Sequence, residues 1–293
     1  MATRWRHQGS VRGGVMAGDR LIDKAVKAEG LSSPFDMAVS QADRETLALV
    51  RAAIDARRVR LAFQPVVMSA DIGRIAFSEG LVRVLDATGR IIPARDFMGA
   101  VERHEMGREI DCLALEQGLA TLTRHPDLRI SVNVSARSIG YPRWQRVLRK
   151  GLAGAPTVAE RLILEIGEES AMTVPETLAA FMAEMQKEGV AFALDDFGGG
   201  TTALGRLRDF YFDFAKIDAS AVRRIDRDAE VQALAAALVG VARAFGMVTV
   251  AVAVETPGEG EVLRSLGVDC LQGYLFGAPS LKPAWEETGQ RRA

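Results

Sequence analysis

Polar residues recur at one place in a series of short apolar segments. They lie within or directly after the C-terminal halves of these segments, and they are Glu79, Asn133, Glu165, Asp195, Asp196, Lys216, Asp218, Glu255 and Gln272. Buried carboxylates are costly unless they are paired or bound to a metal ion. Oxygen ligands alone suit Mg²⁺, Mn²⁺ or Ca²⁺ better than zinc. Together with a lysine, such a set has the residue types that metal-assisted phosphodiester cleavage requires.

Each of these residues also has a purely structural explanation. A single acid can cap a helix or form a surface ion pair, and the glycines at 198–200 can be only a turn. Lys216 and Asp218 are two residues apart, so in a strand they share a face and can pair. One residue at a time, these explanations are the more common. Because the polar residues occupy the same place in successive segments, we favour a shared site, with the glycines bending both Asp195 and Asp196 toward it.

Other kinds of chemistry find little support. The three histidines, His7, His104 and His125, are far apart, and no Cys/His spacing predicts a zinc site. Cys112 and Cys270 lie inside apolar segments, so we expect them to fill the core in a reducing, cytoplasmic compartment.

Short apolar segments alternate with helical patterns after residue 60. The apolar segments span 61–67, 75–84, 128–135, 161–169, 190–198, 214–220, 248–255 and 269–276. Nearly continuous apolar runs are typical of strands that are covered on both faces, and alternation with helices indicates a mainly parallel sheet. About eight strands in this length favour a closed (β/α)₈ barrel over an open sheet. The carboxyl ends of its strands would meet at one rim and bring the polar residues together.

The helices carry recognisable boundary signals. A helix is expected to begin near Asp43, with Leu47, Val50 and Ile54 on one face. Thr173 and Glu176 are spaced as a capping box, with Pro175 in the first turn. Glycines are expected to follow the ends of this helix and of two later ones, at Gly189, Gly246 and Gly267.

Length and composition indicate one large domain with extensions at both ends. Of the 293 residues, 48% are hydrophobic, which is enough for one large core, and the net charge of −1 gives no signal for nucleic acid. No long uncharged apolar run predicts a membrane span, and the basic N-terminus lacks the apolar stretch of a signal peptide. We expect a partly disordered N-terminal extension at 1–42 with a short helix around 19–28, a barrel domain at 43–285 and a C-terminal tail at 286–293.

At these residues the chain resembles the EAL phosphodiesterase family, in order from about Leu61 to Leu281. The matching motifs are FQPVV (63–67), EGLVR (79–83), VNVSA (132–136), LEIGEES (164–170), LDDFGGG (194–200), FDFAKID (212–218), VAVAVET (250–256) and LQGYLFGAP (271–279). The resemblance implies a modified (β/α)₈ barrel of the EAL type with one antiparallel strand. It also implies metal-dependent hydrolysis of cyclic di-GMP to pGpG.

The resemblance assigns roles to individual residues. The implied metal ligands are Glu79, Asn133, Glu165, Asp195 and Asp196, and the implied catalytic residues are Lys216, Glu79 and Asp196. The implied nucleotide-binding residues are Gln64, Leu81, Arg83, Asp218 and Gln272. Glu168 would stabilise the loop after the aspartate pair. The implied cofactor is Mg²⁺ or Mn²⁺, with Ca²⁺ as an inhibitor.

The chain also departs from the family pattern, as a partly degenerate member. Gly80 replaces the signature alanine, and Gly199 and Thr201 replace a threonine and a tyrosine in the loop associated with the second metal and with dimer contacts. Val252 aligns with the first glutamate of the family's AEGVE motif, which is associated with metal-bound water and catalysis. Glu255, three residues along a strand, is expected on the opposite face.

Three functions follow from this comparison. The first is a cyclic di-GMP receptor with weak or absent hydrolysis, the second an active cyclic di-GMP phosphodiesterase, and the third an interaction module that binds no nucleotide. A protein partner and a homodimer are compatible with each of them.

Overall fold

The computed structural model describes residues 34–102, 104–200 and 204–286. The chain divides into two compact units, Met1–Arg44 and Glu45–Ala293. The helix expected around 19–28 lies outside the described residues. Helix α2 (Pro34–Asp55) begins nine residues before Asp43, so the expected start at Asp43 is wrong. Proline is well suited to a first helical position, because the nitrogen there needs no intrahelical acceptor.

The second unit contains a closed barrel of eight strands. These are β1 (Val59–Met68), β2 (Asp71–Leu85), β4 (Ile130–Asn133), β5 (Leu162–Gly167), β6 (Ala191–Phe197), β7 (Phe214–Ile217), β8 (Val248–Ala251) and β9 (Cys270–Gln272). The barrel closes because β1 pairs with both β2 and β9, antiparallel to each, whereas the other barrel strands are parallel to their neighbours. All eight predicted strands are confirmed, as is the barrel with one antiparallel strand.

One further strand lies outside the barrel. β3 (Ile91–Pro93) pairs antiparallel with β2 and was not expected, because three residues are too few to show a periodic pattern.

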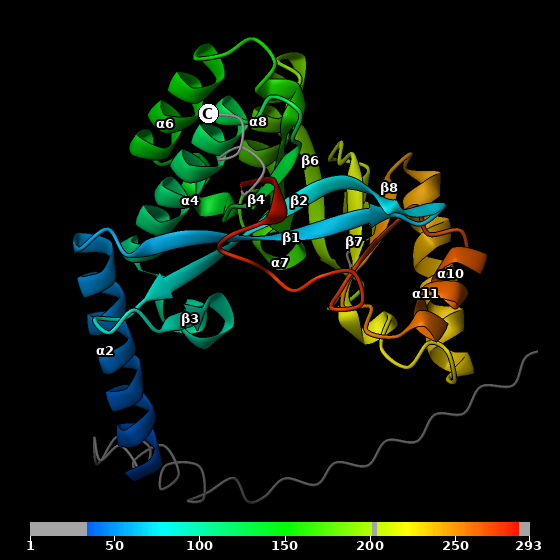
Figure 1. The fold of residues 1–293 in the computed structure, drawn as a ribbon, viewed down its shortest axis with the longest axis horizontal. Helices are drawn as coiled ribbons and strands as arrows, with labels where there is room; N and C mark the ends of the chain where they lie inside the picture. The colour runs from blue at the N-terminus through cyan, green and yellow to red at the C-terminus, as the bar shows by residue number, and fades with distance from the viewer. Residues whose placement is uncertain (1–33, 103, 201–203, 287–293) are drawn as a thin grey trace, which may run out of the picture. The chain divides into compact units, whose positions relative to one another are not determined.

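Helices cover the outside of the barrel. The longer ones are α4 (Glu105–Arg124), α6 (Pro142–Ala153), α8 (Pro175–Lys187), α10 (Ala229–Ala244) and α11 (Pro257–Ser265). Figure 1 shows α4 beside β4, α8 beside β6 and α10 beside β7 and β8, while α6 packs against α4. The expected glycines follow α8, α10 and α11 with φ of 97°, 73° and 80°, a left-handed conformation that glycine adopts freely.

The expected capping box at the start of α8 is wrong. Val174 is the N-cap there and accepts no side-chain hydrogen bond, while the Thr173 hydroxyl donates to the Ser170 carbonyl at 2.7 Å. A complete capping box forms instead at α11, between Thr256 and Glu259.

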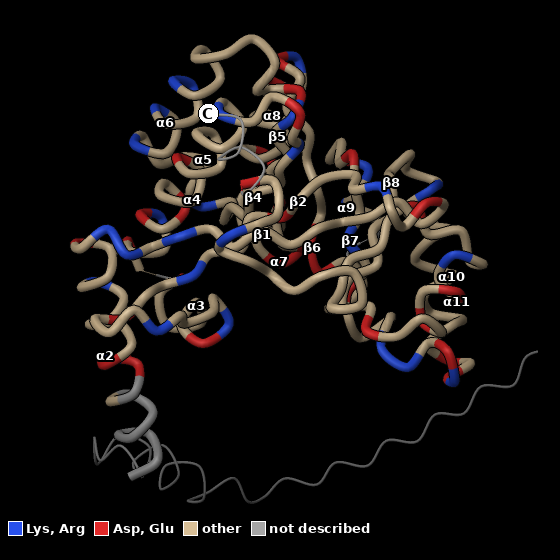
Figure 2. Tube along the Cα trace, viewed as in Figure 1, with Lys and Arg blue, Asp and Glu red and all other residues tan. Residues whose placement is uncertain are grey.

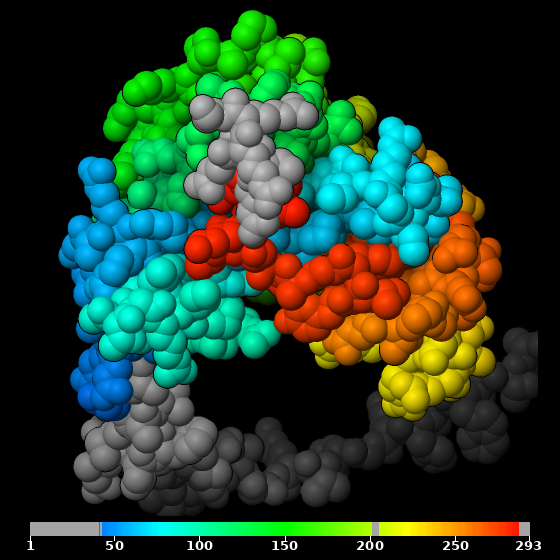
Figure 3. Space-filling view, viewed as in Figure 1, coloured from blue at the N-terminus to red at the C-terminus, as the bar shows by residue number. Residues whose placement is uncertain are grey.

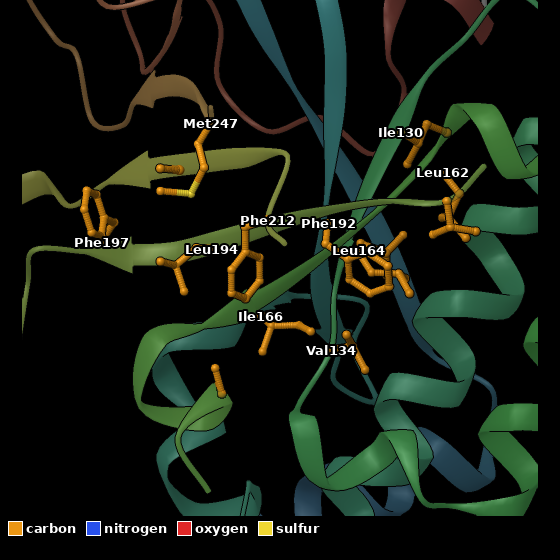
Figure 4. Packing of buried hydrophobic residues seen from close by; sticks show 14 of the residues in the cluster. Ile130, Val134, Leu162, Leu164, Ile166, Phe192, Leu194, Phe197, Phe212 and Met247 are labelled. Carbon is orange, nitrogen blue, oxygen red and sulfur yellow. The ribbon is translucent and has the colours of Figure 1, made fainter. Parts of the chain in front are cut away.

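The core has layers on both sides of the strands. Outward-facing side chains such as Leu164 and Phe192 pack under the helices (Figure 4). Their neighbours, including Ile163 and Ala193, face the barrel interior with Phe77. Both cysteines are buried and free, as expected for core residues. The apolar face of α2 is confirmed, since Val50 is fully buried and Leu47 and Ile54 pack around it.

The segment after β9 returns across β1. Ser280 exchanges two backbone hydrogen bonds with Phe63, and the Trp285 ring packs edge-on against Phe63 at 5.1 Å. Figure 3 shows this red segment lying against the blue and cyan surface of the first strands. Among the described residues, no helix combines the length and apolar character that crossing a membrane would require.

Candidate active site

Six of the polar residues singled out in the sequence lie in a ring inside the barrel. Each ring residue lies two positions after a residue that faces the barrel interior. Because side chains alternate along a strand, the ring residue and that earlier residue both point inward. On successive parallel strands the interior residues are Phe77, Ser131, Ile163, Ala193, Phe214, Val250 and Cys270. The ring residues that follow them are Glu79, Asn133, Glu165, Asp195, Lys216, Val252 and Gln272. β1 runs the opposite way and contributes Gln64, which pairs with Glu79. Seven of these eight positions, which we call the upper ring, are polar, and the eighth is Val252.

Lys216 is the cation of the upper ring. Its Nζ donates to Glu79 Oε2 at 3.0 Å, to Glu165 Oε2, and lies 3.3 Å from Asp195 Oδ1. Lys216 is 2% exposed, and Glu165 is fully buried. The structure therefore brings Lys216 together with three of the acids singled out in the sequence, and the alternative pairing with Asp218 is not formed. β7 ends at Ile217, and the Asp218 carboxylate instead accepts from the Ser220 amide at the start of a short turn.

Amide side chains complete the contacts of Glu79. Asn133 Nδ2 donates to Glu79 Oε1 at 2.8 Å, and Gln272 Nε2 donates to Glu79 Oε2 at 2.6 Å. Gln64 accepts from Gln272 at 3.3 Å and donates to the Gly277 carbonyl at 3.0 Å. Five predicted site residues from five strands thus form one hydrogen-bonded group with Lys216.

Burial and charge act in opposite directions on these carboxylates. Burial alone would raise the pKa of Glu79, but Lys216, Gln272 and Asn133 together lower it below the ordinary value. Burial and the adjacent Glu79 raise the pKa of Glu165 well above its usual range, although Lys216 opposes this. Burial opposes the charge of Lys216, yet three carboxylates raise its pKa well above the usual value. The ring therefore holds an ammonium group among acids that repel one another.

Asp195 and Asp196 both face the site, as expected. The backbone bend that turns them inward begins at Asp196, before the glycines at 198–200. Asp196 itself has φ of 57°, and the pairing of β6 with β7 shifts register between Leu194 and Phe197. Both aspartates line the same two cavities. Burial, Asp195 and Asp218 raise the pKa of Asp196 to about 6.

The segment after β8 differs from the expectation. β8 ends at Ala251, and Ala253 has φ of 58°, so the strand alternation does not continue to Glu255. Val252 and Glu255 line the same cavity, and the expected placement of Glu255 on the opposite face is wrong. Alanine is strained in this conformation, which glycine adopts freely.

The donor chemistry of the ring fits one hard divalent cation. Glu79, Glu165 and Asp195 offer carboxylate oxygens. Asn133 donates to Glu79 through its side-chain nitrogen, so that bond does not use its side-chain carbonyl oxygen. Glu165 Oε1 is buried and has no hydrogen-bond partner in the described part of the chain. Among the described residues, no three acidic, histidine or cysteine side chains converge as a metal site, and Lys216 lies between Glu79 and Glu165. The Val252 side chain offers no oxygen for a second ion.

Cavities open on two sides of the ring. One of about 510 Å³ reaches toward Met98 and Asp111, and one of about 400 Å³ reaches toward Arg83 and Tyr274. Leu81 lines both of them, whereas Arg83, Gln64 and Gln272 line only the second. A third cavity is lined by Glu168 and Asp218 with Asp196, Gly199 and Gly200, which places Glu168 beside the glycine loop. Thr201 lies outside the described residues. Figure 2 shows the acidic residues gathered around β6 and α7.

Asp111 is a buried acid that the sequence did not single out. It accepts from Ser138 Oγ at 2.6 Å and from the Ser135 amide at 3.1 Å, so α4 holds the loop that follows Asn133. Burial raises the pKa of Asp111 to about 6. The sequence signal that could have identified Asp111 is an acidic residue at an otherwise apolar, core-facing position of a helix.

The match to known proteins agrees with this geometry. The EAL domain family model matches residues 48–279. The chain belongs to the EAL domain family. This EAL domain is 29% identical over 231 residues to the cyclic di-GMP phosphodiesterase PdeB of Shewanella oneidensis, covering 78% of the chain and 27% of the relative. It is 29% identical over 243 residues to the cyclic di-GMP phosphodiesterase NbdA of Pseudomonas aeruginosa, covering 81% of the chain and 31% of the relative. The chain thus spans less than a third of the length of these relatives.

Solved structures show the same barrel. PaMucR phosphodiesterase in a c-di-GMP complex superposes with a TM-score of 0.71 at 28% identity, covering 83% of this chain and 99% of that one. An EAL domain protein from Listeria monocytogenes has a TM-score of 0.71 at 26% identity, covering 83% of this chain and 96% of that one.

Proposed function

We propose that this EAL domain is a cyclic di-GMP receptor whose phosphodiester hydrolysis is weak or absent. The observation that carries the proposal is the upper ring. It keeps Glu79, Asn133, Glu165, Asp195 and Lys216 in one bonded group, but it has valine at the eighth position. Valine can neither bind a hydrated cation nor accept a proton from water. Loss of general acid–base catalysis alone costs about 10²–10⁴-fold in rate.

The residues divide between binding and chemistry. Glu79, Asn133, Glu165 and Asp195 would hold one Mg²⁺ or Mn²⁺, which when bound would offset phosphate charge, and Ca²⁺ would compete for the same oxygens. Lys216 supplies a fixed positive charge beside the phosphodiester. Gln64, Leu81, Arg83 and Gln272 line the cavity that receives one nucleoside, and PaMucR, which shares the fold, is solved with c-di-GMP. Asp218 would contact the nucleotide, and Asp196 would face a second ion without help from position 252, because the valine side chain has no oxygen.

An active phosphodiesterase is the second candidate, and one observation favours it. Glu255 lines the cavity that contains Val252, so a carboxylate is present within the site although it is displaced along the chain. The relatives PdeB and NbdA are named phosphodiesterases. A module that binds no nucleotide is disfavoured, because a protein-only role does not require four oxygen ligands around a buried lysine. A homodimer, a protein partner and a cytoplasmic location stay predictions.

Calorimetry with cyclic di-GMP, combined with product analysis of the same samples, tests the proposal. Titrations in Mg²⁺, Mn²⁺, Ca²⁺ and EDTA should show saturable binding with the nucleotide recovered intact. Steady formation of pGpG by the unsubstituted chain would establish the phosphodiesterase. Absence of binding under every condition would leave the interaction module.

A further inference from the structure

Arg95 lies where the two cavities beside the upper ring meet. Among the described residues that line both cavities, it is the only basic one, and the others include the ring acids Glu79 and Asp195. No motif singled it out in the sequence. A ligand that extends from one cavity to the other would therefore lie beside Arg95.

The unexpected strand β3 brings Arg95 to this position. Pro93 pairs with Arg83 on β2, and the chain then enters a short 3₁₀ turn, Ala94–Asp96. Arg95 follows Pro93 by two residues and so returns to the rim near Arg83. Burial and the like charge of Arg95 lower the pKa of Arg83, and both arginines line the same cavity. Figure 2 shows basic residues along β2 and the segment that leads to α3.

Arg95 is weakly held within the protein. Its Nε lies 3.5 Å from Asp96 Oδ1, and the two side chains are 78% and 53% exposed. Exposed ion pairs of this kind contribute little to stability, so the guanidinium can turn to a ligand at small cost. Lys216, by contrast, is already surrounded by three carboxylates.

We infer that Arg95 binds the second phosphodiester of a cyclic dinucleotide, the one that does not lie over the upper ring. This assignment rests on the proposed cyclic di-GMP binding and extends it. A cyclic dinucleotide carries two negative phosphodiesters, and the three acids around Lys216 leave little positive charge for both. The planar guanidinium is suited to two hydrogen bonds with phosphate oxygens.

The test is calorimetric titration of the whole chain with cyclic di-GMP, for the unsubstituted protein, R95A, R95K and R90A. Arg90 is an exposed arginine of the preceding turn that lines neither cavity, so R90A is the matched control. We expect R95A to bind about tenfold more weakly, because one charge-assisted contact is lost. R95K should retain part of the affinity, and R90A should bind as the unsubstituted chain does.

Salt dependence separates a charge contact from a change of shape. The affinity of the unsubstituted chain should fall with added NaCl more steeply than that of R95A, because an exposed ionic contact is screened. Binding by R95A within twofold of the unsubstituted chain would overturn the assignment alone. Equal weakening in R95A and R95K, with unchanged salt dependence, would also overturn it. Absence of binding by the unsubstituted chain would reject the proposed function and this assignment with it.

Discussion

Substitution of Lys216 by methionine removes the one cation of the upper ring while keeping a side chain of similar length. The Lys216 ammonium contacts Glu79 at 3.0 Å and Asp195 at 3.3 Å, and it donates to the fully buried Glu165. Without it, acids that repel one another would stay in a site with little access to water. We therefore expect K216M to fold less stably than the unsubstituted chain when no divalent cation is present.

The size of the effect follows from this burial. Breaking a buried ion pair by removing one partner costs about 3–5 kcal/mol of unfolding free energy, because an uncompensated charge is left behind. In a domain of this size about 1 kcal/mol shifts the Tm by roughly 2–4 °C, so the Tm should fall by roughly 10 °C. Protonation of Glu165 limits the loss, since its pKa is already raised by burial and by Glu79. Mg²⁺ should restore part of the stability, because a ligand that binds only the folded state stabilises it.

The assay is thermal and urea unfolding of K216M in EDTA and in excess Mg²⁺. K150M is the control, since Lys150 is an exposed lysine on α6 that is expected to change the unfolding free energy by no more than about 0.5 kcal/mol. K216M should gain more stability from Mg²⁺ than either the unsubstituted chain or K150M does. If K216M in EDTA were as stable as K150M, the ring acids would not depend on the lysine, and the electrostatic reasoning would be refuted.

Three further substitutions test other features. V252E should raise Mg²⁺-dependent formation of pGpG at least about 10²-fold, because it restores an acid to the eighth ring position; an unchanged rate measured by chromatography would show that Val252 is not the cause of weak hydrolysis. Asp111 has a pKa raised to about 6 in the folded state, above its unfolded value, so the folded state binds the extra proton and stability falls as pH rises from about 4 to about 6. The unfolding free energy should fall by up to about 3 kcal/mol across this range relative to D111N, and parallel pH profiles for the two proteins would contradict this. A253G should stabilise the folded protein by about 1 kcal/mol and raise the Tm by a few degrees, because glycine adopts the φ of 58° at position 253 without the strain that alanine has there. A lower Tm would show that the alanine methyl group makes a needed contact.

Much of this protein could be predicted from the sequence because strand burial and strand polarity are local patterns. Nearly continuous apolar runs identified all eight barrel strands, since strands covered on both faces need apolar residues on both. Polar residues at the ends of those runs identified the ring, because parallel strands bring their carboxyl ends to one rim. The boundary glycines of α8, α10 and α11 were equally clear, as each sits at positive φ.

Other features depended on tertiary contacts that no local pattern encodes. Thr173 could cap a helix by its spacing, but its hydroxyl is already bonded to Ser170, and the true capping box lies at Thr256. Lys216 could pair with Asp218 by spacing, but β7 ends between them, and the lysine meets acids from β2, β5 and β6 instead. Glu255 reaches the cavity of Val252 because Ala253 turns the backbone where strand alternation was expected to continue. The sequence by itself determined the barrel and six of the seven polar positions of the ring, because strand burial and the polarity of strand ends are local patterns. Only the tertiary structure decided which ring charges meet and that Arg95 joins the two cavities, because those relations depend on where strands end and how β3 returns to β2.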